Sequence, residues 1–338
     1  MEKDNKFSLL NKSGFWITIL LTSAGFILAV LENVFFPQIS DKVVFQQYSV
    51  GTASIDINQA FRIFLLFLIL LYTIIGIYSY SDAEKRKKYV SRLNFRFALG
   101  IVLGIWDLTG TKLLLLPQPF FPGPAGIIEA FLAEGDFIFE NMLYSLRLYI
   151  FGFSFGTILG VGTGILIGWF KAADYWISPV MNITGVIPAV AWMPFALTLF
   201  PEPFSAAVFL IVICAWFPIA SLTALGIKSI PKAQFEAART LGGKTWFLLL
   251  YIAIPHAMPN IFTGIKTANA FAFTTLVMAE MLGQPGGLGY YINISKVWSA
   301  YYKVFAAIIV MAVLFTIITK IISIIENYVL RWQRGLVK

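Results

Sequence analysis

The stretch SIPKAQFEAARTLGGKTWFLLLYIAIP, residues 229–255, decides how the rest of the chain is interpreted. It is a polar segment between two long apolar runs, and it carries the signals of a short helix with defined ends. Pro231 suits the first turn of a helix, residues 232–241 favour helix, and Gly242 can adopt the left-handed conformation that ends one. A simple connection between apolar segments would not need such a helix, so the pattern indicates a helix that fits a partner protein.

The predicted helix has one apolar face. Phe235, Ala238 and Leu241 recur every three residues and share this face, while Glu236 and Arg239 lie beside it. The small alanine side chains keep the surface low, so that an apolar cleft on a partner can close over it. The alternative is a helix that packs only on the membrane end of its own chain.

The composition is that of a membrane protein. Hydrophobic residues make up 59% of the 338 residues and charged residues only 12%, about half the charge of an ordinary soluble domain. A run of about 20 apolar residues spans a bilayer. Eight segments meet this criterion: residues 15–36, 61–80, 97–116, 146–169, 177–200, 204–227, 251–282 and 303–326.

Two of these segments are unusual. Asp107 and Lys112 interrupt residues 97–116, which makes this segment the weakest of the eight. Three prolines in residues 177–200 predict a bent or broken span, which membrane proteins tolerate where neighbouring helices or water satisfy the freed backbone groups. We therefore expect an all-α polytopic membrane protein with about eight transmembrane helices.

The distribution of positive charge predicts the orientation. Lys and Arg are enriched in the short cytosolic loops of membrane proteins. With residues 229–250 and both termini in the cytosol, 17 of the 25 Lys and Arg residues lie on the cytosolic side and 6 outside, with Lys266 and Lys320 inside spans. The net charge of +8 thus reflects topology in a lipid bilayer, and we expect no binding of nucleic acid.

Catalytic chemistry is not expected in this chain. Gly243-Lys244-Thr245 imitates the end of a nucleotide-binding loop, but position 238 is Ala where that loop needs Gly, and no hydrophobic strand precedes it. One His and one Cys cannot form a structural zinc site. We therefore predict no enzyme activity, no cofactor and no metal, and the energy for any active transport must come from another subunit.

The polar segment resembles the EAA loop of ABC importer permeases, whose pattern is Glu-Ala-Ala, three residues, Gly, nine residues, Ile-x-Leu-Pro. Here it reads Glu236-Ala237-Ala238, Gly242 and Ile252-Ala253-Ile254-Pro255, with Ile254 in place of Leu as the one departure. In that family the loop, here residues 229–250, is the coupling helix that docks into a cleft on the ATPase subunit. The resemblance assigns ATPase docking to Phe235, Glu236, Ala237, Ala238, Arg239, Leu241 and Gly242.

Residues 93–338 resemble the nitrate, sulfonate, taurine and bicarbonate branch of these permeases. The matching segments are Trp106-Asp107, Phe121-Pro122-Gly123-Pro124, Ile187–Pro194 with its Ile-Pro-x-x-Ala-Trp-x-Pro pattern, and Ala279–Gly289 with its Ala-Glu and Gly-Leu-Gly elements. Phe200-Pro201-Glu202-Pro203 departs from the Phe-Gly that many members carry, which puts contacts with the solute in doubt more than the fold.

The resemblance implies the transmembrane domain of a type I ABC importer in the inner membrane of a bacterium or archaeon. It implies a second permease copy, cytosolic ATPase subunits and an external solute-binding protein as partners. The implied solute is a small oxyanion or sulfonate, and the alternative is a thiamine-precursor pyrimidine. A channel, an ion-coupled secondary transporter and a membrane scaffold without transport are the other classes considered.

Polar residues inside the predicted spans are candidates for the pore or its gate. The same residues can instead make ordinary hydrogen bonds between helices or support the architecture. Lys266 and Glu280 lie fourteen residues apart in one span, about 21 Å along a helix, too far to pair directly. The candidates are Thr198, Lys266, Asn269, Thr274, Thr275 and Glu280.

Two further features concern organisation. Residues 1–92 match no family pattern and are predicted to be an accessory region with two spans and a basic connector at residues 82–88. This connector either anchors the chain in the cytosol or binds anionic lipid.

Glycines recur every four residues at positions 152, 156, 160, 164 and 168. Such a row predicts close helix packing, either within one subunit or between two copies.

Overall fold

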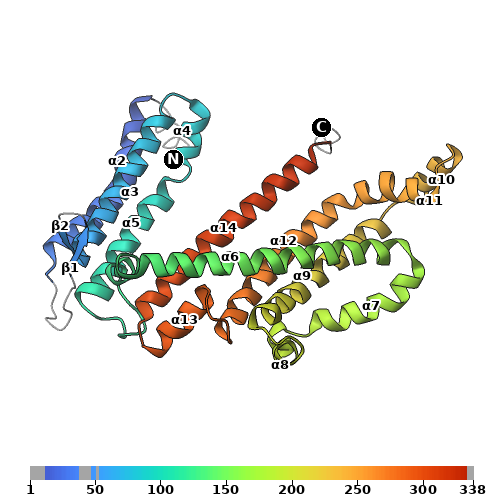
Figure 1. Ribbon diagram of the computed structural model, residues 1–338. Coiled ribbons are helices and arrows are strands. Elements are labelled where there is room, and N and C mark those ends of the chain that lie inside the picture. Colours follow the sequence, from blue (N-terminus) through green and yellow to red (C-terminus); the bar gives the residue numbers. More distant parts are fainter. Residues whose placement is uncertain (1–11, 38–46, 51–52, 333–338) are drawn as a thin grey trace. The chain divides into compact units, whose positions relative to one another are not determined.

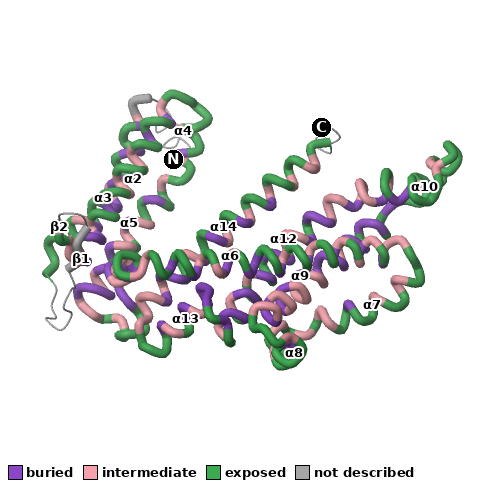
Figure 2. The backbone as a smooth tube through the Cα atoms, in the orientation of Figure 1, coloured by how far each residue is buried: buried purple, intermediate pink, exposed green. Residues whose placement is uncertain are grey.

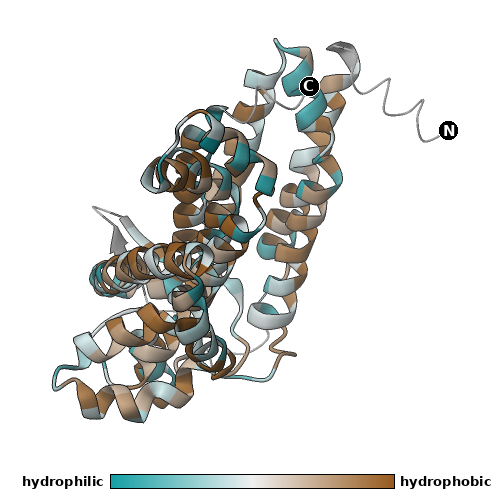
Figure 3. Cartoon of the chain, turned by 90° about the vertical axis from the view of Figure 1, so that its right-hand side faces the viewer, coloured by the Kyte–Doolittle hydropathy of each residue, from teal (hydrophilic) through white to brown (hydrophobic). Residues whose placement is uncertain are grey.

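The computed structural model describes residues 12–37, 47–50 and 53–332. Over these residues the chain is helical, as predicted, apart from one short antiparallel hairpin, and hydrophobic residues predominate on its long helices (Figure 1, Figure 3). It divides into two compact units. Unit 1 comprises Met1–Gly135 and Ser295–Ala306, and unit 2 comprises Asp136–Ile294 and Ala307–Lys338. The predicted boundary near residue 92 stays a prediction.

Unit 1 is built on three apolar helices. Its elements are α2 (Lys12–Phe35), β1 (Gln47–Val50), β2 (Ala53–Asp56), α3 (Ile57–Ser79), α4 (Ala83–Val90), α5 (Leu93–Asp107) and the π-helical turn η1 (Leu108–Lys112). Asp56 caps α3 by accepting a hydrogen bond from the N–H of Asn58, in a capping box that Gln59 completes. Phe26, Phe61 and Leu65 form the fully buried centre that joins α2 to α3.

The hairpin lies between the first two long helices. β1 pairs with β2 so that Gln47 faces Asp56 and Tyr48 faces Ile55. The Tyr48 hydroxyl donates a hydrogen bond of 3.0 Å to Glu129 Oε1. Partial burial, followed by this contact with Glu129, raises the pKa of Tyr48 to about 12, so the hydroxyl stays protonated at neutral pH.

Buried polar side chains also join the helices of unit 1. Asn33 Nδ2 donates to Asp107 Oδ2 at 2.7 Å and to Asn58 Oδ1 at 3.1 Å. Lys112 Nζ donates to the Asn33 carbonyl at 3.1 Å. The two charges that interrupt residues 97–116 are therefore buried inside unit 1, where they fasten the end of α5 and η1 to α2.

Unit 2 contains the remaining helices. They are α6 (Pro124–Trp169), α7 (Lys171–Val186), the 3₁₀ turn η2 (Ala189–Trp192), α8 (Met193–Leu199), α9 (Pro203–Lys228), α10 (Lys232–Thr240), α11 (Thr245–Leu248), the π-helical turn η3 (Leu249–Ala253), α12 (Ile254–Met281), α13 (Leu288–Val297) and α14 (Tyr301–Val329). The backbone leaves helical geometry at Glu134 within α6. α6 and α14 begin in unit 1, and α13 ends in it. α9 and α12 pack against each other extensively.

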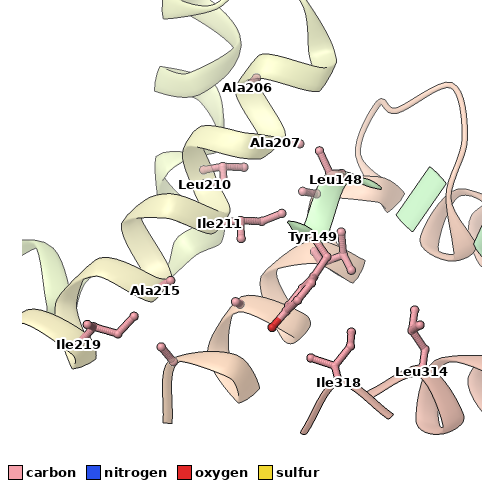
Figure 4. Close-up of a cluster of buried hydrophobic side chains, with 14 of the residues drawn as sticks. Leu148, Tyr149, Ala206, Ala207, Leu210, Ile211, Ala215, Ile219, Leu314 and Ile318 are labelled. Carbon is pink, nitrogen blue, oxygen red and sulfur yellow. The ribbon is translucent and has the colours of Figure 1, made fainter. Parts of the chain in front are cut away.

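The glycine row of α6 packs on α9. A Cβ atom at Gly156 or Gly160 would meet the Cβ atom of Ala215 or Ile219 at 2.7 Å, and one at Gly164 would meet Thr223 Cβ at 2.5 Å. The partner residues on α9 also recur every four residues, so two rows of equal spacing face each other. Next to this seam, Leu148 and Tyr149 of α6 lie against Ile211 of α9 (Figure 4). Of the two alternatives predicted for the row, the structure realises packing within one subunit.

The number of membrane-spanning helices differs from the prediction. Among the described residues, six helices are long and apolar enough to cross a membrane: Gly14–Phe35, Ile57–Ser79, Pro124–Trp169, Pro203–Lys228, Thr245–Met281 and Tyr301–Val329. A seventh candidate is the bent pair Lys171–Val186 and Ala189–Leu199. The count of eight is not confirmed.

The predicted span at residues 97–116 is not among these candidates and stays a prediction. α5 is only 15 residues long and passes into the π-helical turn at Leu108, because Asp107 and Lys112 are drawn into the polar contacts around Asn33. The predicted break in residues 177–200 is confirmed, since the two helices of this segment meet at an angle of 105°. The break falls at Ile187 and Pro188, whose extended backbone separates α7 from η2.

Candidate functional site

The helix predicted from residues 232–241 is α10, and its ends form as the sequence indicates. Pro231 has extended backbone geometry at the N-cap position. At the other end Gly242 has a φ of +84°, and its N–H donates to the Arg239 carbonyl at 2.9 Å. The N–H of Gly243 donates to the Ala238 carbonyl at 2.9 Å. These two bonds constitute a Schellman motif, which requires a residue that tolerates positive φ, so the predicted helix stop at Gly242 is confirmed.

One face of α10 packs on its own chain. The Phe235 ring lies 5.7 Å from the Trp169 ring, measured between centroids, in an edge-to-face arrangement. Phe235 also packs against a buried cluster that includes Ile227 of α9 and Ala257 of α12. Trp169 is the last residue of α6. One aromatic side chain of α10 therefore contacts the end of α6 and packs on a cluster to which α9 and α12 contribute.

The opposite face of α10 is exposed (Figure 2). Ala233, Glu236, Ala237 and Thr240 follow the spacing of one helix face and are all exposed, and Leu241 at the end of the helix is 90% exposed. Phe235 and Ala238, which the sequence analysis placed on the docking face, are half-buried toward the chain itself. The surface free for a partner is thus the alanine and Glu236 face with Leu241, and docking itself stays a prediction.

The second feature of interest is a pocket at the break between α7 and η2. It has a volume of about 400 Å³ and is lined by the backbone around the break, by Phe217 of α9 and by Phe271 of α12. Three hydroxyls also line it, those of Thr184, Thr274 and Thr275. No charged side chain is among the described residues that line it.

The hydroxyls of this pocket have a common orientation. Thr184 Oγ1 donates to the Val180 carbonyl at 2.9 Å, and Thr274 Oγ1 donates to the Ala270 carbonyl at 3.0 Å. Because each proton is directed at the carbonyl four residues earlier, the oxygen lone pairs are left to accept hydrogen bonds. The pocket thus combines aromatic rings with hydrogen-bond acceptors. It lies at the break of the bent pair of helices that is the seventh candidate span.

Of the six polar candidates, only Thr274 and Thr275 line this pocket. Thr198 lies on α8, where its hydroxyl donates to the Pro194 carbonyl at 2.8 Å. Asn269 is buried and connects three helices, since it accepts a hydrogen bond of 2.5 Å from the Tyr149 hydroxyl and donates to Thr319 at 3.0 Å. Asn269 therefore makes the interhelical hydrogen bonds that were the alternative to a pore role.

Lys266 forms an ion pair with Glu326 of α14. Sequence reasoning did not identify this partner, because Glu326 lies 60 residues away at the end of another helix. The signal available was that Glu326 is an acidic residue at the edge of a predicted span. The pair is partly exposed, and it fastens α14 to α12.

Glu280 is buried and fixes the turn that precedes α13. Its Oε2 accepts a hydrogen bond of 2.8 Å from the N–H of Gly289. The two preceding N–H groups, of Gly287 and Leu288, are bound by Asn141 at 2.9 Å and Ser145 at 2.8 Å. Three consecutive backbone donors are thus each satisfied by a side chain, and the structure does not bring Glu280 together with the other candidates.

A metal site is not formed in the part of the chain that the structure describes, where no three His, Cys, Asp or Glu side chains are close enough together to hold an ion. Two candidate functional features remain from the preceding description. They are an anchored helix with one exposed face, and a pocket at a broken span.

Comparisons with known proteins agree with this arrangement. The model of the family described as "Binding-protein-dependent transport system inner membrane component" matches residues 156–334. The putative aliphatic sulfonates transport permease protein SsuC of Bacillus subtilis is 28% identical over 75% of this chain and 95% of its own length. The nitrate import permease protein NrtB of Synechococcus elongatus is 31% identical over 64% of this chain and 79% of its own.

One further relative and one solved structure are also similar to this chain. The bicarbonate transport system permease protein CmpB of Synechococcus elongatus is 29% identical over 61% of this chain and 75% of its own length. The inward-facing structure of the MetNI methionine ABC transporter shares the fold, with a TM-score of 0.50 and 19% identity over 58% of this chain and 98% of that chain. The family match covers more than half of the sequence, and the chain therefore belongs to the binding-protein-dependent transport system inner membrane component family, as an ABC importer permease of the nitrate, sulfonate and bicarbonate branch.

Proposed function

We propose that this chain is the membrane-spanning subunit through which an ATP-driven importer moves a small solute, and that α10 is its contact with a separate cytosolic ATPase. The observation that carries the proposal is the two-sided character of α10. Phe235 anchors one side to the ends of α6, α9 and α12, while Glu236 and Ala237 are exposed on the other. A connection of no mechanical importance would not need both a fixed end at Gly242 and this anchor.

The anchor gives a physical route for transmitting movement. A displacement of α10 acts on Trp169 through the Phe235 ring. It acts on α12 through the short turn at residues 241–244 and then through α11 and η3, which run into α12 without a loop. Close-packed helices transmit displacement because they are hardly compressible. The rows of Gly156 and Ala215 couple α6 to α9 in the same way, and α9 in turn forms one wall of the pocket at the break.

Alternating access follows from this connection. When the ATPase subunits close, α10 would carry the ends of α6, α9 and α12 with it and change the access to the pocket. A second permease copy completes the pathway, and a solute-binding protein delivers the solute on the opposite side. The excess of Lys and Arg on one side supports a topology with both termini and α10 in the cytosol.

The solute class is proposed from the relatives. Their names point to aliphatic sulfonates, nitrate and bicarbonate, so we propose a small oxyanion or sulfonate. The described lining of the pocket offers no cation to bind such a solute tightly. Passage would rely on hydration by the hydroxyls of Thr184, Thr274 and Thr275 after they rotate, with selectivity supplied by the binding protein.

A flat, neutral heteroaromatic solute, such as a thiamine-precursor pyrimidine, is the second candidate. It is favoured by the orientation of the hydroxyls, since Thr184 and Thr274 present acceptors that suit amino groups better than oxyanions. Phe217 and Phe271 offer aromatic surface for such a ring. Uptake of radiolabelled sulfonate, nitrate, bicarbonate and aminopyrimidine by cells that express the complete importer separates the two candidates.

The docking proposal is tested by reversing one charge on the exposed face of α10. Glu236→Arg is expected to reduce co-purification with the ATPase and to lower uptake at least tenfold, because the Arg side chain replaces a charged contact at the rim of the docked helix. Gln234→Arg is the matched control, since it adds an arginine to α10 outside the face formed by Ala233, Glu236, Ala237 and Thr240. Normal uptake by Glu236→Arg, with normal amounts in the membrane, would reject docking through this face.

A further inference from the structure

Unit 1 contains a basic pocket, defined by the four cationic side chains that line it: Lys85, Lys88, Arg92 and Arg96. Its volume is about 400 Å³. The walls come from the end of α3, from α4 and from the start of α5. Most of the lining residues lie within residues 1–92, which match no family pattern, and Phe95 and Arg96 lie just after them. The positions 85, 88, 92 and 96 are spaced by three or four residues along the chain.

Arg96 forms the fixed part of the basic pocket. It is only 9% exposed, and its Nη1 donates to the Tyr89 carbonyl at 3.1 Å. The guanidinium carbon lies 4.0 Å from the centroid of the Tyr89 ring and 5.5 Å from that of Tyr72. The Tyr89 hydroxyl itself donates to the Tyr72 carbonyl at 3.0 Å. The guanidinium is thus held in one position by a hydrogen bond and two rings, while its planar fork retains further donors.

The other three cations are exposed at the rim of the pocket. Lys85 Nζ lies 4.3 Å from the centroid of the Tyr78 ring and 3.2 Å from its hydroxyl, which directs the ammonium group toward α3. Among the described residues, Lys85, Lys88, Arg92 and Arg96 form no ion pair with a carboxylate. Four positive charges therefore converge on one pocket without a described neutralising partner.

The basic pocket lies where the apolar run of α3 ends. The candidate span Ile57–Ser79 finishes among the lining residues, and Ile75 and the exposed Phe95 contribute apolar walls. Tyrosines such as Tyr72 and Tyr78 are typical of the boundary between the hydrocarbon core and the headgroups. A ligand here would have its charged part among the cations and its apolar part beside α3.

We propose that the basic pocket binds the phosphate group of an anionic phospholipid. Arg offers several donors to phosphate oxygens, and charge-assisted hydrogen bonds of this kind are stronger than neutral ones. Clusters of Lys and Arg next to the end of a membrane span favour acidic headgroups, and the apolar walls favour a lipid over a soluble phosphate compound. The pocket fastens unit 1 to the lipid leaflet by a specific contact in addition to general attraction.

The test measures thermal unfolding of the full-length chain in detergent with added lipid. Dioleoyl phosphatidylglycerol is expected to raise the midpoint temperature, whereas dioleoyl phosphatidylcholine, which carries no net charge, is expected to leave it unchanged. Lys88→Gln and Arg92→Gln should each weaken the apparent affinity for phosphatidylglycerol about fivefold. Lys87→Gln is the matched control, because Lys87 is an exposed neighbour that does not line the pocket. This variant should bind phosphatidylglycerol with the affinity of the unmodified protein.

Inorganic phosphate and glycerol 3-phosphate, added without lipid, distinguish the source of the phosphate. No shift with either compound supports the lipid, and a shift that Lys88→Gln abolishes keeps the phosphate site but assigns it to a soluble compound. Equal shifts with phosphatidylglycerol and phosphatidylcholine, or equal weakening by Lys87→Gln and Lys88→Gln, would overturn the site. All three variants replace exposed side chains, so folding is not expected to limit the comparison.

Discussion

Glu280 illustrates how a charged residue inside a predicted span can serve the architecture. Glu280 belongs to the Ala-Glu element and lies inside a predicted span, which makes it a candidate for the pore or gate. In the structure its carboxylate accepts the N–H of Gly289, beside the N–H groups that Asn141 and Ser145 bind. The side chain is buried and thus holds the turn before α13 in place.

Replacing this acceptor should cost stability. Glu280→Leu leaves the buried N–H of Gly289 without a partner, and we expect the free energy of unfolding to fall by about 1–3 kcal/mol. Glu280→Gln keeps an oxygen acceptor of the same length and is expected to be close to the unmodified protein. Thermal unfolding in detergent measures both, and an equal loss in the two variants would contradict a role through this hydrogen bond.

At the scale of elements, the contact between α6 and α9 depends on the absence of side chains at every fourth position of α6. The glycines let the two backbones approach closely, which replaces the hydrophobic driving force that is missing between helices in lipid. Gly160 faces Ile219 within this seam, whereas Gly162 on the same helix has no atom within 4 Å of the position of a Cβ. The same substitution can therefore be compared inside and outside the seam.

Gly160→Ala and Gly162→Ala are expected to have different effects on the free energy of unfolding. At Gly160 the new Cβ would lie 2.7 Å from Ile219 Cβ, and the resulting overpacking should lower the free energy of unfolding by about 1–3 kcal/mol. At Gly162 alanine fits without contact and should be neutral or stabilising by about 0.5–1 kcal/mol, because alanine is the better helix former. Unfolding of the purified chain in detergent is the measurement, and equal effects at both positions would mean that the seam is not close-packed.

Elements also show where sequence reasoning succeeded and where it failed. The ends of α10 were predictable because Pro231 and Gly242 act on their own local backbone. The span expected at residues 97–116 is not among the candidate spans. Asp107 and Lys112 of this segment bind Asn33 of another helix, and apolar length alone does not reveal such a partner. The outward face of α10 was not predicted either, since Phe235 is held by Trp169, 66 residues earlier in the sequence.

At the scale of the whole molecule, the reactivity of the single cysteine can be used to test the proposed coupling between α10 and the pocket. Cys214 is the only cysteine of the chain, and it lines the pocket at the broken span together with Phe217 and Thr275. α9, which carries it, also contacts α6 along the glycine row and contributes Ile227 to the cluster around Phe235. Movement of α10 should therefore reach the surroundings of this thiol.

We expect the reactivity of Cys214 toward a small water-soluble thiol reagent to change several-fold when the complete importer is trapped with ATP. The physical reason is that alternating access changes the exposure of the pocket to water. The rate of modification, followed by mass spectrometry with and without nucleotide, is the measurement. Cys214→Ser gives the background rate of modification, and Glu236→Arg should remove the difference between the rates with and without nucleotide. Identical rates in both states of the unmodified importer would argue against coupling between α10 and the pocket.

The sequence by itself determined the membrane class, the capped helix at residues 232–241, a break within residues 177–200 and the family. Apolar length, glycine and proline geometry and motif spacing are properties of neighbouring residues. Only the tertiary structure decided that Glu326 pairs with Lys266, that the glycine row meets α9, that Asn269 bonds to Tyr149, and that Lys85, Lys88, Arg92 and Arg96 line one pocket. These contacts join residues from different helices or depend on how neighbouring helices fold back on each other. Their formation follows from packing, which local sequence does not encode in a readable form.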